Sequence, residues 1–197
     1  RALLGEVPPA RLFDELIKLL MTGHALAAYE ALRQHHLLEQ LLPDTAAAVA
    51  ADECADRFLR QALINTDTRV ATQQRVTPAF LFAALLWPPI AATIARPARA
   101  TETAVLSEAA AEVIAKAVRR VAIPRRFSTA AREIWELQSR LIQPRARQVP
   151  ALLQHPRFRA AFDLLLLREQ SGDAATQGMG DWWERYQAMD NDQREQA

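Results

Sequence analysis

The sequence predicts an all-α fold, an irregular multi-helix bundle built from pairs of neighbouring antiparallel helices (αα-hairpins). Half of the 197 residues are apolar, but only 7% are aromatic and five are glycine, a composition typical of helices packed on helices. Apolar residues recur at helical spacing in several stretches, and runs of Val, Ile and Thr that would indicate strands are missing. A chain of this length buries about 70% of its unfolded surface, so a globular core is expected.

The first part of the chain predicts an αα-hairpin. Pro8 and Pro9 suit the first turn of a helix, Gly23 stands where a C-terminal cap belongs, and apolar residues recur between them at Leu12, Leu16, Leu19 and Leu20. A second helix is expected from about residue 24 to 36, followed by a short apolar segment that Pro43 ends. The alanine-rich stretch 45–65 then predicts a third, long helix.

The polar stretch 66–77 is predicted to be a loop, in which Asp67 caps a turn and holds Arg69 by a charge-assisted hydrogen bond. Thr77 and Pro78 supply the N-cap and first position of the next helix, which Pro88 and Pro89 should end. Beyond a break at Pro97, Thr103 or Ser107 is expected to cap a helix that extends to about Val121.

The last third of the chain predicts three more helices. Ser128 or Thr129 should cap the first, which presents Ile134, Leu137 and Leu141 on one face and Arg132, Glu136 and Arg140 on another, so that some arginines are partly neutralised. Pro144 closes this helix and Pro156 begins the next. Residues 171–180 look like a flexible linker before a short aromatic helix.

The strongest functional signal is a basic block. Residues 116–159 carry eleven basic residues against Glu133 and Glu136, although the whole chain has a net charge of only +1. Ten of the eleven are arginine, the side chain that forks onto phosphate and stacks on bases, so the block indicates a polyanionic partner. The alternative is an ordinary arginine-rich surface.

Within this block the expected RNA contacts are Arg119, Arg120, Arg125, Arg126, Arg132, Arg140, Arg145 and Arg147, with Arg157 and Arg159 as second choices. Phosphate is expected most at the two pairs that flank the central helix, Arg125/Arg126 and Arg145/Arg147, because a helix N-terminus also attracts anions. Trp135 is open to two interpretations, as a stacking surface for a base or as a core residue beside Ile134.

No catalytic residue and no metal ligand is predicted. The four histidines form no HExxH pattern, and the sequence has no Walker loop, GxGxxG turn or GxSxG elbow. The single cysteine, Cys54, rules out an internal disulfide and favours a reducing cytoplasm, and no apolar run is long enough to predict a membrane span. Because the chain begins at Arg1 inside a helical pattern, it is interpreted as part of a longer protein.

Several stretches resemble a known enzyme family. PPARLFDELIKLL and ALAAYEALRQHHLLEQLLP resemble the neck helices of the nucleotidyltransferases that include CCA-adding enzymes and poly(A) polymerases. The segments NTDTRV, RVTPAFLFAALLW, VAIPRRFSTAAREIWELQ and LLQHPRFRAAFDLLLLR, with the late WW pair, are similar to bacterial poly(A) polymerases in particular.

This resemblance implies a polynucleotide adenylyltransferase that adds adenylates from ATP to RNA 3′ ends without a template, and marks transcripts for decay. The family's glycine-serine turn with a DxD pair on a strand, which serves two-metal transfer with Mg²⁺ in an N-terminal α/β domain, is missing here, as is its EDxxR motif. The resemblance thus implies a neck-like region (1–66), a basic RNA-binding body (67–170) and a linker with a terminal aromatic helix (171–197), inactive without the catalytic domain.

Two alternatives stay open at this point. One is the C-terminal region of a tRNA CCA-adding enzyme, which belongs to the same group. The other is a helical protein-interaction module that docks an RNA helicase or ribonuclease of the decay machinery through Trp182 and Trp183.

Overall fold

The computed structural model describes residues 2–96 and 101–190, and within these ranges the chain is helical with no strand, which confirms the all-α prediction. The elements in chain order are η1 (Ala2–Glu6), α1 (Pro9–Leu20), α2 (Ala25–Gln34), α3 (Leu38–Leu41), α4 (Pro43–Ala51), α5 (Glu53–Ala71), α6 (Pro78–Leu85), α7 (Trp87–Ile94), α8 (Glu102–Val121), α9 (Arg125–Ile142), η2 (Ala146–Gln148), α10 (Val149–Leu153), α11 (Phe158–Ser171), η3 (Ala174–Thr176) and α12 (Met179–Ala188).

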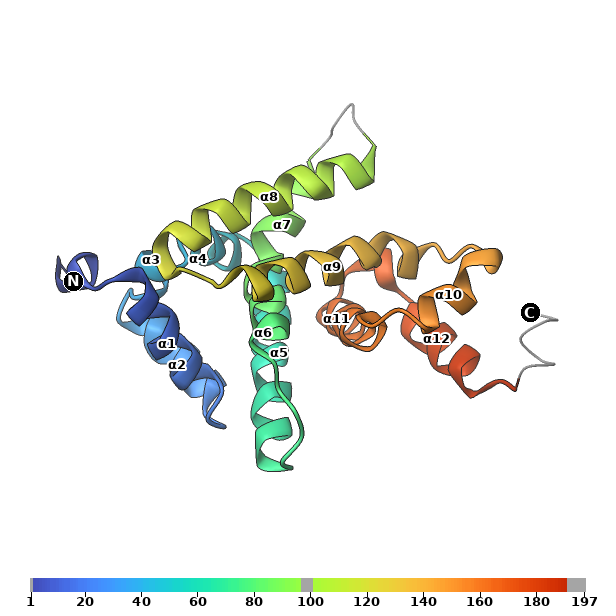
Figure 1. The fold of residues 1–197 in the computed structure, drawn as a ribbon, viewed down its shortest axis with the longest axis horizontal. Coiled ribbons are helices and arrows are strands. Elements are labelled where there is room, and N and C mark those ends of the chain that lie inside the picture. Colours follow the sequence, from blue (N-terminus) through green and yellow to red (C-terminus); the bar gives the residue numbers. More distant parts are fainter. Residues whose placement is uncertain (1, 97–100, 191–197) are drawn as a thin grey trace.

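The predicted first hairpin is confirmed, with α1 and α2 side by side (Figure 1). Leu16 and Leu20 of α1 are buried in the core. Gly23 in the connection has a φ of +91°, and a Cβ there would lie 3.3 Å from Cγ1 of Val70. Glycine therefore lets the hairpin turn close against α5.

The single long helix predicted over 45–65 is wrong, because the chain breaks into α4 and α5 at Asp52. Asp52 adopts an extended conformation, and its carboxylate accepts a hydrogen bond from the Cys54 N–H at 2.8 Å. Aspartate at this position is a good N-cap, so the break costs α5 little.

The loop predicted over 66–77 is also wrong in its first half, because α5 continues to Ala71. The hydroxyl groups of Thr66 and Thr68 donate to carbonyl oxygens four residues earlier, at 2.8 and 2.9 Å, so these polar residues are satisfied inside a helix. Sequence polarity alone could not show this.

Asp67 caps a helix, but a different one from that expected. Its carboxylate accepts from the N–H groups of Ala25 and Leu26, at 2.6 and 3.1 Å, at the start of α2. Arg69, which was expected to bind Asp67, forms an ion pair with Asp163 of α11 at 2.7 Å. The last turns of α5 thereby connect α2 to α11.

A charged cluster also fastens α2 to α5. The carboxylate of Asp56 accepts from the Tyr29 hydroxyl (2.8 Å), Arg33 (2.6 Å) and Arg60 (2.8 Å), and Arg60 reaches Glu30 as well. Burial, aided by the hydrogen bond to Asp56, raises the pKa of the Tyr29 hydroxyl far above its usual value. Burial of Asp56 opposes its ionisation, but the hydrogen bonds from Arg60 and Tyr29 outweigh this and lower its pKa.

Thr77 caps α6 as predicted, accepting from the Phe80 N–H at 3.3 Å. Pro88 and Pro89 do not end that helix, because α6 stops at Leu85 and the prolines occupy the first turn of α7. The cap of α8 is Thr101, not Thr103 or Ser107. Pro97 lies outside the described residues.

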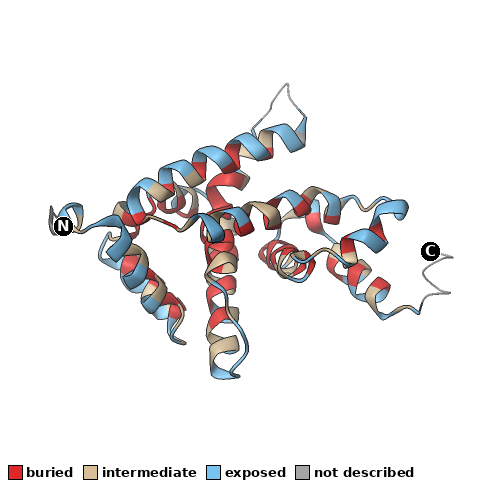
Figure 2. Cartoon of the chain, in the orientation of Figure 1, coloured by how far each residue is buried: buried red, intermediate tan, exposed pale blue. Residues whose placement is uncertain are grey.

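The centre of the molecule is α6, which is fully buried over residues 81–85 and partly buried before them (Figure 2). It packs along α9, and α9 in turn packs against α8 and α11. The division at residues 66 and 170 stays a prediction, and its first boundary lies within the continuous helix α5. The segment expected to be a flexible linker contains η3, where Thr176 is fully buried.

Candidate nucleic-acid interface

Four arginines of the basic block gather at the turn between α8 and α9. Arg119 and Arg120 lie in the last turn of α8, and Arg125 and Arg126 form the first turn of α9. The turn is tight because Ala122 adopts a left-handed conformation, with a φ of +45°. All four side chains belong to exposed residues, and Figure 2 shows the outer face of α8 exposed along its length.

The predicted cap of α9 at Ser128 or Thr129 is wrong, because the helix begins one turn earlier, after Pro124. The Ser128 hydroxyl donates to the carbonyl oxygen of Arg125 at 3.1 Å, inside the helix. Arg125 and Arg126 therefore stand in the first helical turn and not in a preceding loop.

The α9 N-terminus concentrates positive charge. It has no acidic residue in its first turn, so the partial positive charge of the helix end adds to two guanidinium groups. The guanidinium of Arg126 sits 4.7 Å from the ring centre of Phe127, which stacks on Phe13 of α1. In the part of the chain that the structure describes, none of the four arginines at this turn forms an ion pair.

A second pair of arginines follows the other end of α9. Arg145 precedes η2, Arg147 lies within it, and both are exposed. Neither has a salt-bridge partner among the described residues. Since 18 helical residues span about 27 Å, α9 separates the two arginine groups by roughly that length (Figure 1).

The expected neutralisation of Arg132 and Arg140 by Glu136 is not found. No ion pair joins these three residues, all of which are described. The carboxylate that does pair on α9 is Glu133, which accepts from Arg157 of the connection before α11 at 2.7 Å. Arg132 and Arg140 therefore remain available between the two ends of the helix.

The second-choice arginines, Arg157 and Arg159, are partly neutralised. Arg157 pairs with Glu133, and Arg159 pairs with Asp163 at 3.0 Å. Asp163 holds Arg69 on its other oxygen. Arg69 and Arg75 lie outside the basic block and were missed, because they are distant from it in the sequence and reach this group only when α5 packs against α11.

The interpretation of Trp135 as a base-stacking residue is wrong. Its side chain is fully buried, and its indole N–H donates to the carbonyl oxygen of Ala83 at 3.0 Å. Trp183 is likewise buried, with its N–H bound to the carbonyl oxygen of Leu141 at 2.9 Å. Both tryptophans anchor helices to the core, as amphipathic aromatics do when their N–H finds a partner.

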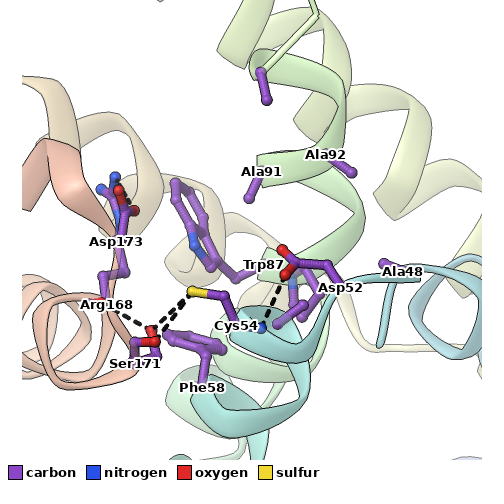
Figure 3. Close-up of a pocket in the computed structure, with 13 residues that line it drawn as sticks. Ala48, Asp52, Cys54, Phe58, Trp87, Ala91, Ala92, Arg168, Ser171 and Asp173 are labelled. Carbon is purple, nitrogen blue, oxygen red and sulfur yellow. Dashed lines mark hydrogen bonds and ion pairs between the residues drawn. The ribbon is translucent and has the colours of Figure 1, made fainter. Parts of the chain in front are cut away.

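A pocket of about 250 Å³ between α4, α5, α7 and α11 offers a different kind of chemistry (Figure 3). Its arginine, Arg168, stacks 4.6 Å from the ring centre of Trp87 and pairs with Asp173 at 2.8 Å. The Cys54 thiol donates to the carbonyl oxygen of Ser171 at 3.2 Å. These polar groups bind one another, so the side chains that line the pocket hold the surrounding helices together.

Nowhere in ranges 2–96 and 101–190 do three or more His, Cys, Asp or Glu side chains come together as a metal site. Within those ranges, no helix combines the length and apolar character needed to cross a membrane.

Comparisons with known proteins agree with the arginine-rich geometry. A family model described as the polymerase A arginine-rich C-terminus matches residues 98–197, and one described as the probable RNA and SrmB-binding site of polymerase A matches residues 1–49. The chain is 40% identical over 192 residues to poly(A) polymerase I of Salmonella typhi, covering 94% of this chain and 41% of that protein.

Other relatives give the same result. Poly(A) polymerase I of Escherichia coli O157:H7 is 40% identical over 191 residues, with 94% of this chain and 41% of the relative covered. That of Haemophilus influenzae is 39% identical over 199 residues, with 98% and 44% covered. The chain thus spans less than half the length of these curated relatives, and the matched part is their C-terminal region. Since the arginine-rich model alone matches half of its residues, the chain belongs to the polymerase A family, as the C-terminal part of such a protein.

Proposed function

We propose that this chain is the RNA-holding part of a poly(A) polymerase, and that it presents an RNA 3′ end to a catalytic domain for template-independent adenylation. The observation that carries this proposal is the set of arginines at the two ends of α9, at the α8–α9 turn and around η2, that form no ion pair with any described residue. Arginines without carboxylate partners keep their full charge for phosphate.

The arrangement suits a single strand followed along its backbone. The arginine groups are separated by the length of one helix, with Arg132 and Arg140 between them. Guanidinium groups that contact successive phosphates bind with little regard to base sequence. Such binding fits an enzyme that must accept many different transcripts in the bacterial cytoplasm.

The chemistry of transfer belongs to the rest of the protein in this proposal. ATP and Mg²⁺ would be bound by the catalytic domain, as in nucleotidyl transfer assisted by two metal ions. We expect the 197-residue chain to bind RNA but to add no adenylate when it is incubated with ATP, Mg²⁺ and RNA.

The test is RNA affinity as a function of salt concentration, for the parent chain and for the double variant Arg125→Ala/Arg126→Ala. Loss of two phosphate contacts should flatten the slope of log affinity against log salt by about 1.4 for a single strand. The matched control is Arg96→Ala/Arg185→Ala, which also removes two positive charges. Arg185 lies on α12, and Arg96 lines a pocket that contains Asp44 and Glu112. An equal change in both double variants would remove the α8–α9 turn from the RNA path.

The CCA-adding alternative predicts a preference for tRNA. The matched family and the relatives named above are poly(A) polymerases, which favours unstructured RNA. Binding of the same chain to tRNA and to an A-rich single strand of equal length separates the two. Tighter binding to tRNA would support the CCA-adding alternative.

A second candidate function is the docking of a protein partner. It was expected at the terminal aromatic helix, but residues 1–49 are the better candidate. Trp183 is buried, so α12 does not offer it to a partner. The family description that mentions SrmB applies to residues 1–49, where Leu19 of α1 is 45% exposed. Leu19→Glu should reduce retention of SrmB in a pull-down, while Trp182→Ala should leave it unchanged.

A further inference from the structure

A pocket of about 220 Å³ lies where α5, α6, α9 and α11 meet, separate from the α8–α9 turn. Its lining includes four arginines, Arg69, Arg75, Arg157 and Arg159, which reach it from the end of α5, the α5–α6 loop and the start of α11. Apolar side chains, among them Phe80 and Ile134, form much of the rest of its lining, together with a few polar ones such as Thr77. Figure 1 shows α11 beside the column formed by α5 and α6.

The pocket has an excess of positive charge. Its lining contains one carboxylate, Asp163, and among the described residues the only other acid that binds one of these arginines is Glu133. Arg75 is exposed and makes no ion pair or side-chain hydrogen bond with any described residue. At least Arg75 therefore keeps its full charge for a ligand.

Two of the arginines are held in place. Asp163 is only 13% exposed, and its two oxygens bind Arg69 at 2.7 Å and Arg159 at 3.0 Å. Arg159 nevertheless remains 70% exposed. A buried carboxylate that orients two guanidinium groups reduces the entropy lost when they bind an anion.

We propose that this pocket binds one nucleotide of single-stranded RNA, with a phosphate on Arg75 and Arg159 and the base against Phe80. The proposal rests on the proposed function and names a further contact for the same RNA. Pockets for drug-sized ligands measure about 300–1,000 Å³, so this smaller space suits a single base. A base in an A-form duplex is stacked and cannot enter, whereas a single strand can turn one out.

The pocket lies next to the α8–α9 turn along α9. Arg126, Ala130 and Ile134 are spaced four residues apart, so they share one face of the helix. Ala130 and Ile134 line the pocket, and Arg126 stands about 6 Å before Ala130 along the axis. A strand bound at the turn therefore reaches the pocket without crossing the helix.

The first test uses Arg75→Ala with a single-stranded A-rich oligoribonucleotide. We expect the slope of log affinity against log salt to flatten by about 0.7, as for one lost phosphate contact. The control Arg96→Ala removes one exposed arginine from the neighbourhood of Asp44 and Glu112 and should leave the slope unchanged. Equal slopes for Arg75→Ala and the parent would overturn the proposal.

The second test addresses the base. We expect an oligoribonucleotide with abasic positions to bind the parent about tenfold more weakly, and Phe80→Leu, which keeps an apolar side chain, to lose most of that difference. If Phe80→Leu retained the full difference, no base would stack on this residue and the proposal would fail. Polyglutamate is a competitor that represents an acidic peptide. If polyglutamate displaced RNA from the parent chain, and Arg75→Ala weakened the binding of polyglutamate as much as the binding of RNA, the proposal would be overturned in favour of an acidic peptide.

The two proposals fail in distinguishable ways. If Arg125→Ala/Arg126→Ala flattens the slope and the pocket variants do not, RNA binding stands and the pocket has no part in it. If the parent chain shows no salt-dependent affinity for RNA, both proposals are wrong.

Discussion

At the scale of single residues, Asp56 is the carboxylate on which the contact between two helices depends, because Tyr29 and Arg33 of α2 and Arg60 of α5 all donate to it. Its pKa is lowered in the folded chain, so folding favours the ionised form. The resulting stabilisation is complete above the ordinary pKa of about 3.9 and is lost as the pH falls through the lower folded value.

Asp56→Asn should therefore lower the free energy of unfolding by about 1–3 kcal/mol at pH 7. Between about pH 5 and pH 2, the free energy of unfolding of the parent should fall more steeply than that of the variant. Urea unfolding at a series of pH values measures both effects. Asp14→Asn, on the exposed face of α1, is the control, and an equal acid dependence in Asp56→Asn and the parent would contradict the role given to Asp56.

The basic block can be recognised in the sequence because the charges of its side chains can be counted without knowing the fold. Trp135 could not be assigned in the same way, since a tryptophan beside an isoleucine reads equally well as a surface or a core residue. Its partner, the carbonyl oxygen of Ala83, lies on a helix 52 residues away. Arg69 and Arg75 join the candidate site through the packing of α5 on α11, which is a tertiary event without a local signal.

At the scale of elements, the spacing of apolar residues predicted most helices, while their ends were less predictable. The first hairpin and the Thr77 cap were found because proline, glycine and threonine act locally. The start of α9 was misplaced by one turn because Ser128 and Thr129 are capping residues, whereas Pro124, which precedes the helix, has no side chain that can cap it; two arginines in a first turn also oppose the helix dipole. Such local conflicts are typical of functional positions.

The α8–α9 turn gives a prediction about the left-handed residue Ala122. Ala122→Gly should raise the free energy of unfolding by about 0.5–1 kcal/mol, because glycine adopts this conformation without a steric penalty. Thermal unfolding measures the change, and RNA affinity should stay constant.

The matched control for this substitution is Ala111→Gly, at an exposed position inside α8. Glycine in a helix interior should destabilise by about 1 kcal/mol. If both glycine variants lost stability, the left-handed conformation of Ala122 would carry no strain.

At the scale of the whole molecule, one hydrophobic core includes residues from Leu16 of α1 to Tyr186 of α12. Asp67 and Arg69 bind α2 and α11 from the same end of α5. The regions assigned as neck and body are thus joined by a continuous helix and by side-chain contacts on both sides of it.

We therefore expect the chain to unfold in a single cooperative transition. All four tryptophans lie beyond residue 66, so their fluorescence reports the body, whereas circular dichroism at 222 nm reports helices throughout the chain. Melting curves from the two probes should coincide. A fluorescence transition at a clearly different temperature would show that the two regions unfold independently.

One face of α9 is fixed in the core by Trp135, whereas the arginines at the two ends of the helix remain in solvent. In the proposed complex, the phosphate contacts would lie at the ends of a helix that is anchored in the core. Translocation after each added adenylate would then require only that the strand slip by one nucleotide over contacts that do not distinguish one base from another.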